Sequence, residues 1–190
     1  MSARTTPATA IARPHEVADF WAGAGPERWW KKDDAFDAQI ARRFAATQRA
    51  AAAGTLDAWE EGTPDEALAL VIVLDQFSRN LHRGSWRAFA QDAKSIALVH
   101  RLMARGADRR MRDDIGLFVY LPLMHSETLA DQAICLREME RLGLEENAKF
   151  ARIHLEAVER FGRFPHRNAV LGRVSTPAEI AYLAEGGFAG

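Results

Sequence analysis

Residues 75–84 combine charged and amide side chains in a pattern that suits anion binding. The stretch reads Asp-Gln-Phe-Ser-Arg-Asn-Leu-His-Arg-Gly and follows directly on an apolar run. Asp75, Arg79 and Arg83 are four residues apart, so a continuing helix would place them on one face. An aspartate can hold one guanidinium while the second binds a carboxylate or phosphate, and Asn80 would orient that ligand. The alternative is a helix-end ion pair beside a cation at the helix's negative end.

A second polar group lies at residues 120–127, where a proline interrupts a helical pattern. The proline removes a backbone donor, and the next turn carries His125 and Glu127. A histidine near a carboxylate suits general acid–base catalysis, and Tyr120 is a candidate ligand contact. In the simpler interpretation, Ser126 caps the following helix and Glu127 is stabilised by the helix dipole.

A third polar group, residues 162–173, is a loop that holds three arginines, a histidine and an asparagine. Guanidinium groups grip carboxylate or phosphate, so we expect Arg167 to bind an anion, Asn168 to orient it and His166 to move protons. The alternative is a solvated basic loop that pairs with nearby acids. The Arg-Asn dipeptide also occurs at residues 79–80. Two such pairs, if they converge, would suit a ligand with two anionic ends or one phosphate gripped from both sides.

The candidate site residues therefore fall into two roles. The catalytic candidates are His125, His166, Glu127 and Asp75, and the ligand-binding candidates are Arg79, Asn80, Arg83, Arg167, Asn168, Tyr120 and Trp30. Trp30 is included because two adjacent tryptophans cannot both point into one helix face, so one can stack on a flat ligand; core packing is the alternative.

The sequence indicates neither a metal site nor a cofactor. The candidate ligands His82, His125, Glu127 and His166 lack close helical spacing. There is no glycine loop of the nucleotide-binding type and no Gly-x-Ser-x-Gly elbow.

Composition limits the partners and the compartment. Lys and Arg number 25 against 26 Asp and Glu, a net charge of −1, which argues against general nucleic-acid binding. Cys135 is the single cysteine, so we expect a reducing compartment. The longest apolar run, residues 67–74, is far short of the roughly 20 residues of a membrane span. We therefore expect a cytoplasmic protein with no membrane partner.

The elements that must position these groups are all helical. Start and stop signals, among them capping boxes at residues 63–66 and 176–179, combine with apolar spacing to predict the helices. They cover residues 14–23, 33–53, 64–74, 92–105, 112–123, with Pro122 kinking or ending this one, 127–142, 145–161 and 176–186. The helix over 64–74 is apolar all round and belongs in the core. We predict an all-α fold without a sheet, built of antiparallel helical hairpins around one core. Residues 1–12 are predicted to form a flexible tail and residues 13–190 a single helical domain.

The same motifs carry a family resemblance. The matching stretches are Pro-Glu-Arg-Trp-Trp at 26–30, Asp-Gln-Phe-Ser-Arg-Asn at 75–80, His-Ser-Glu at 125–127, and Phe-Gly-Arg-Phe-Pro-His-Arg-Asn at 161–168, extending to Thr-Pro at 176–177. They resemble the bacterial family known as domain of unknown function 924. The resemblance implies a helical fold similar to tetratricopeptide-like proteins, and it implies no activity.

Three functions fit these residues. The first is binding of, or catalysis on, a small anionic ligand at the Arg/Asn/His cluster. The second is a peptide- or protein-binding tetratricopeptide-like module whose arginines clamp an acidic peptide. The third is a buried polar network that only fixes helix packing.

Overall fold

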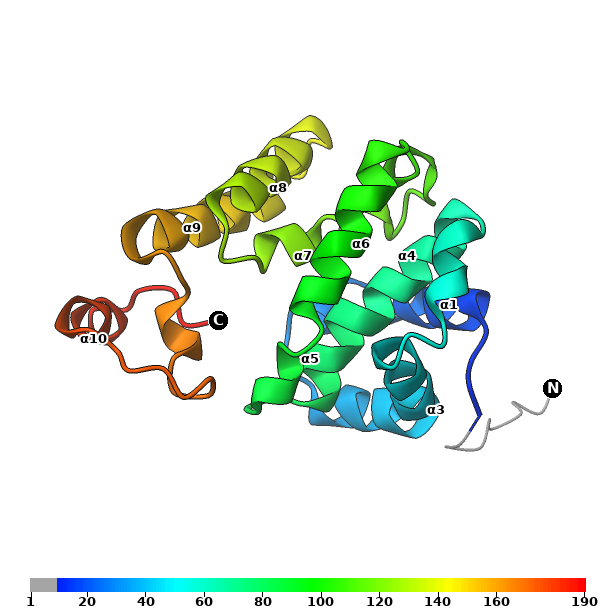
Figure 1. Cartoon of the computed structure of the whole chain (residues 1–190), viewed down its shortest axis with the longest axis horizontal. Coiled ribbons are helices and arrows are strands. Elements are labelled where there is room, and N and C mark those ends of the chain that lie inside the picture. Colours follow the sequence, from blue (N-terminus) through cyan, green and yellow to red (C-terminus); the bar gives the residue numbers. More distant parts are fainter. Residues whose placement is uncertain (1–9) are drawn as a thin grey trace. The chain divides into compact units, whose positions relative to one another are not determined.

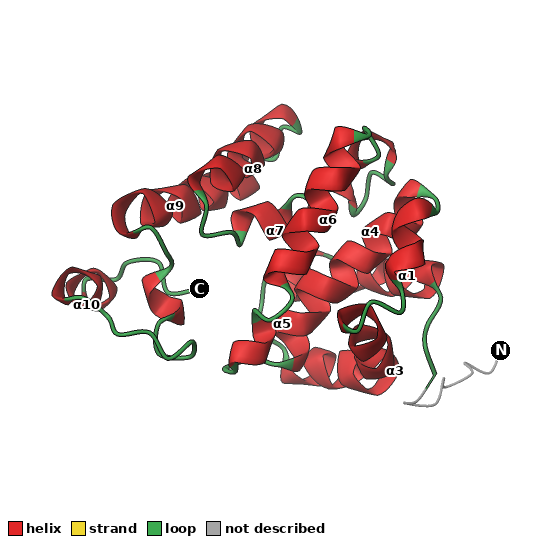
Figure 2. Cartoon of the chain, in the orientation of Figure 1, coloured by secondary structure: helices red, strands yellow, loops and turns green. Residues whose placement is uncertain are grey.

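The computed structural model describes residues 10–190 (Figures 1 and 2), and these contain helices and loops but no strand. The prediction of an all-α fold is confirmed. The chain divides after Val119 into two compact units, called here the N-terminal and C-terminal units, and each is described by itself. Of the predicted tail, residues 1–9 lie outside the described part. Ala12 is buried, and its backbone N–H donates to Thr47 Oγ1 over 2.8 Å.

The N-terminal unit contains six α-helices within its described residues. They are α1 (Pro14–Ala24), α2 (Pro26–Trp29), α3 (Asp34–Ala52), α4 (Pro64–Ile72), α5 (Ser78–Leu81) and α6 (Asp92–Ala104). Asp33 caps α3, because its carboxylate accepts the N–H groups of Ala35 and Phe36. Thr63 and Glu66 form the predicted capping box of α4.

Helix α4 lies at the centre of this unit, as predicted from its apolar sequence. Residues 67–72 are all buried, and α4 packs against α1 and α6. A π-helical turn, Val73–Phe77, joins α4 to α5. Phe77 lies among the aromatic rings of Phe20, Trp21 and Phe44. The core therefore continues directly into the first polar group.

The C-terminal unit contains α7 (Leu121–Met124), α8 (Leu129–Arg141), α9 (Glu145–Phe161) and α10 (Pro177–Ala184). Helices α8 and α9 form a tightly packed hairpin joined by a three-residue loop. The prediction of a helix from about Arg112, kinked or ended by Pro122, is wrong. A short 3₁₀ turn, Gly116–Val119, precedes α7 instead, and Pro122 lies in the first turn of α7, where a missing N–H does no harm.

No helix in the described part of the chain is both long and apolar enough to cross a membrane.

Candidate anion-binding site

The third polar group begins where α9 ends. Gly162 adopts the left-handed conformation, φ +68°, that closes a helix, and its N–H donates to the Val158 carbonyl. The chain then passes through Phe164 and a 3₁₀ turn, Pro165–Arg167, and runs as a loop to Thr176. We call residues 162–176 the arginine loop.

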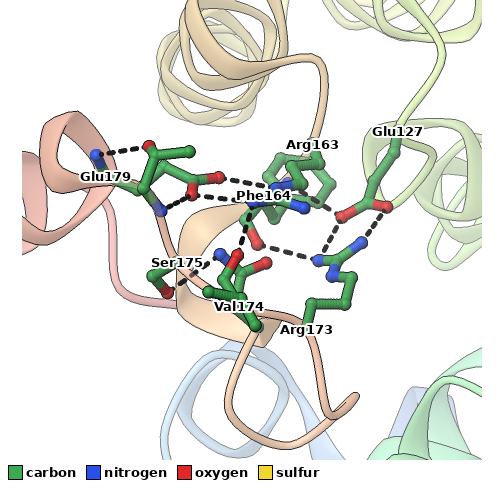
Figure 3. A network of polar contacts seen from close by, with 9 residues as sticks. Glu127, Arg163, Phe164, Arg173, Val174, Ser175 and Glu179 are labelled. Carbon is green, nitrogen blue, oxygen red and sulfur yellow. Dashed lines mark hydrogen bonds and ion pairs between the residues drawn. The ribbon is translucent and has the colours of Figure 1, made fainter.

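Glu127, just before α8, anchors this loop. One carboxylate oxygen accepts the Phe164 N–H at 2.8 Å, and both oxygens accept from Arg173 at 2.7 and 2.9 Å. Arg173 also donates to the Phe164 carbonyl, so its guanidinium lies between a carboxylate and a backbone oxygen (Figure 3). Burial would raise the pKa of Glu127, but Arg173 and the Phe164 N–H hold that pKa below its ordinary value.

Glu179 anchors the other end of the loop. It accepts two hydrogen bonds from Arg163, at 2.6 and 2.8 Å, and the N–H of Thr176 at 2.7 Å (Figure 3). Thr176 accepts the Glu179 N–H in return, which is the predicted capping box of α10. Asn168 Nδ2 donates to Ser175 Oγ over 3.1 Å and ties the 3₁₀ turn to the same segment.

The turn itself holds a buried cation. Arg167 is 6% exposed, and its guanidinium carbon lies 4.6 Å from the centre of the Phe164 ring. Three buried side-chain atoms beside it, His166 Nδ1, Asn168 Oδ1 and Arg173 Nε, have no hydrogen-bond partner among the described residues. An unpaired buried polar atom costs about 1–3 kcal/mol, so three in eight residues call for a physical explanation.

Three imidazoles gather near this turn. The ring of His154, on α9, lies 6.4 Å from that of His125 and 5.5 Å from that of Phe164, measured between centroids. Phe188 packs against both His154, at 4.1 Å, and His166, at 4.9 Å. Burial lowers the pKa of His154 to about 3 and that of His166 to about 4, with Arg167 adding to both shifts. Both imidazoles are therefore neutral at pH 7.

His154, whose ring lies near those of His125 and Phe164, is not among the candidates that the sequence offered. Its place in the series Ala151, His154 and Val158 puts it on the buried face of α9. That spacing was the available signal. The Nδ1 atom of His154 lies 2.8 Å from the Phe150 carbonyl oxygen, so Nε2 is the ring nitrogen that this contact leaves unused.

Two other candidate residues of the C-terminal unit, Glu127 and Tyr120, form hydrogen bonds with arginine side chains. Glu127 uses both carboxylate oxygens on Arg173 and the Phe164 N–H, so it is engaged within the arginine loop. Tyr120 is 1% exposed, and its hydroxyl accepts from Arg141 over 3.3 Å.

The first polar group belongs to the N-terminal unit and is internally paired. Asp75 is fully buried in the π-helical turn and forms an ion pair with Arg79 at 3.1 Å, as its spacing predicted. Arg79 also binds both carboxylate oxygens of Asp92. Burial would lower the pKa of Arg79, but the two aspartates raise it above its ordinary value.

Arg83 does not share that helix face, and this part of the prediction is wrong. Helix α5 ends at Leu81, so Arg83 lies beyond it and binds Asp37 of α3 instead. Asn80 donates to the same carboxylate over 2.7 Å. These contacts fasten α5 to α3.

Trp30 is half exposed. It stacks on Phe118 at 5.6 Å and meets Trp29 edge to face. The two Arg-Asn dipeptides lie in different units, so their convergence on one ligand stays a prediction. Among residues 10–190, no group of three His, Cys, Asp or Glu side chains is arranged to hold a metal ion.

The fold and the site thus define an all-α protein in which arginine–carboxylate pairs hold helices and loops together within each unit. The chain belongs to the family described as bacterial protein of unknown function (DUF924), which matches residues 17–187. It is also similar to the solved structure of a protein of unknown function from Agrobacterium tumefaciens, with 40% sequence identity and a TM-score of 0.86. That match covers 91% of this chain and 97% of the other. Among the curated proteins, none matches this chain.

Proposed function

We propose that the protein binds a small anionic ligand, one that bears a carboxylate or phosphate, at the turn formed by residues 164–168. The observation that carries the proposal is the buried Arg167 beside His166 Nδ1 and Asn168 Oδ1, two atoms that no described residue satisfies. A guanidinium matches the oxygens of either anion. The asparagine oxygen would accept from a ligand hydroxyl, and the imidazole nitrogen would complete the set.

Proton transfer from the bound ligand to His166 is a natural extension of this proposal. An imidazole that burial keeps neutral at pH 7 can accept a proton, and His166 adjoins the cation that would hold the anion. His125 keeps its proposed catalytic role through its place beside His154. Glu127 acts on the ligand indirectly, by holding Arg173 and the Phe164 backbone in place.

The contacts of residues 75–83 favour an architectural role for the first polar group. Its cations bind Asp37 and Asp92 within the same unit, which is how a network that fixes helix packing is built. An acidic peptide bound by a tetratricopeptide-like surface remains the alternative for the protein as a whole. A cytoplasmic location is part of the proposal, on the grounds of composition and the single cysteine.

Native mass spectrometry of the freshly purified protein tests the proposal. The wild type should carry a mass excess that disappears on denaturation, and Arg167→Ala should lack it. Arg152→Ala is the matched control, because Arg152 is half exposed on α9 and, among residues 10–190, pairs only with Glu140. Equal loss of the excess in both variants would argue against the site.

A further inference from the structure

A cavity lies where the end of α9 meets the first turn of α10. Its volume is about 510 Å³, within the range of small-molecule sites. Three charged side chains line it, Arg160, Arg163 and Glu179, together with Phe161, Thr176 and Ala178. These lining charges sum to +1.

The side-chain groups of this cavity that are still available for hydrogen bonding to a ligand are donors. Glu179 is the single carboxylate of the lining, and Arg163 and Thr176 already occupy it. Arg163 donates through Nε and Nη2, whereas its Nη1 has no acceptor among the described residues. The Thr176 hydroxyl accepts from the Glu179 N–H and also forms a hydrogen bond with the Glu179 carboxylate, so it is already engaged. A ligand here must therefore supply acceptors.

Arg160 supplies the unneutralised charge. Its guanidinium lies over two rings, 4.9 Å from the centre of Phe161 and 5.3 Å from that of Tyr182, and it forms no ion pair with any described residue. The centroids of these two rings are 4.9 Å apart, so the guanidinium makes cation–π contacts with a pair of packed aromatic rings. Phe161 and Ala178 give the same cavity an apolar side.

We propose that this cavity binds a small carboxylate with an apolar body, separately from the anion at Arg167. The carboxylate lies against Arg160 and Arg163 Nη1, and the apolar body lies against Phe161 and Ala178. One carboxylate balances the net charge of the lining. The inference stands apart from the proposed function, because none of the six lining residues belongs to the turn that holds Arg167.

Amide NMR titration with benzoate tests this inference, with benzamide as the uncharged partner of the same shape and inorganic phosphate as the anion without an apolar body. Benzoate should give saturable shifts at Phe161, Ala178 and Glu179, and the other two probes should bind at least about fivefold more weakly. Arg160 is exposed and makes no ion pair in the described part of the chain, so Arg160→Gln should weaken benzoate binding about fivefold without unfolding the protein.

Arg152→Gln, on the same helix and outside the cavity, should leave benzoate binding unchanged. The inference is overturned if benzamide binds as well as benzoate, if the two arginine variants weaken binding equally, or if no saturable shift appears. Arg167→Ala keeps the two proposals apart, since it should abolish binding at the turn and leave these shifts intact.

Discussion

The Glu127–Arg173 pair carries a stability prediction that can be worked from its geometry. Glu127→Ala removes three hydrogen bonds, two to Arg173 and one to the Phe164 N–H. A hydrogen bond to a charged group contributes about 1.5–3 kcal/mol when buried, whereas an exposed ion pair contributes about 0–1 kcal/mol. The Glu127 and Arg173 side chains are 28% and 24% exposed, between these limits. We therefore expect Glu127→Ala to lower the free energy of unfolding of this region by about 3 kcal/mol.

A double-mutant cycle isolates the pair from the loss of each side chain alone. Combined with Arg173→Ala, Glu127→Ala should give a coupling energy of about 1.5 kcal/mol. All five tryptophans lie before residue 87, so their fluorescence reports on the N-terminal unit. Hydrogen exchange of peptides from residues 127–176 at increasing urea is the suitable assay.

The pH dependence of the pair has a definite sign. Because the pKa of Glu127 is lower in the folded protein, its contribution is complete above the ordinary value of 4.5 and is lost as pH falls through the lowered value. Glu140→Ala is the control, since Glu140 and Arg152 are each 52% exposed, and it should cost under about 0.5 kcal/mol. A coupling energy no larger than that of the Glu140 pair would refute the reasoning.

Three further predictions follow from the burial and close packing of particular side chains. Leu70→Asp places a charge at a position that is 1% exposed in α4, so we expect no cooperative unfolding transition by circular dichroism; a soluble, cooperative variant would contradict the placement of α4. Gly187→Ala would put a Cβ atom 2.5 Å from Tyr182 Cζ, so the melting temperature should fall, and an unchanged melting temperature would show that the ring moves aside cheaply. Burial lowers the pKa values of His154 and His166 to about 3 and about 4, so their contribution to stability is complete above about pH 6.5 and declines as pH falls toward those values. His154→Gln should flatten the change in urea midpoint over that pH range, and an unaltered profile would argue against a buried neutral ring.

Local signals in the sequence predicted local structure well. The two capping boxes at Thr63 and Thr176 start α4 and α10 as expected, because each is a contact within four residues. The pair of Asp75 and Arg79 likewise follows from a spacing of four.

Contacts between distant residues could not be predicted in this way. Glu127 and Arg173 are 46 positions apart, as are Asp37 and Arg83, and nothing local in the sequence selects these partners. The sequence placed Arg83 on the helix face of Asp75 and Arg79, but α5 ends at Leu81. The helix also widens into a π-helical turn at Val73–Phe77, and the apolar pattern of the sequence does not reveal this turn. The candidate site in the C-terminal unit was therefore proposed from residue type, while its geometry depends on how α8, α9 and the arginine loop pack.

The measurement that most directly tests the central claim is NMR of the histidine side chains at pH 7 during titration with inorganic phosphate and with citrate. At the start, the ring nitrogens of His154 and His166 should report neutral imidazoles. One of the two anions should then shift the His166 signals saturably in the wild type and in Arg152→Ala, but not in Arg167→Ala. Protonated rings at the start, or His166 signals that respond equally in Arg167→Ala, would contradict an anion site at this turn.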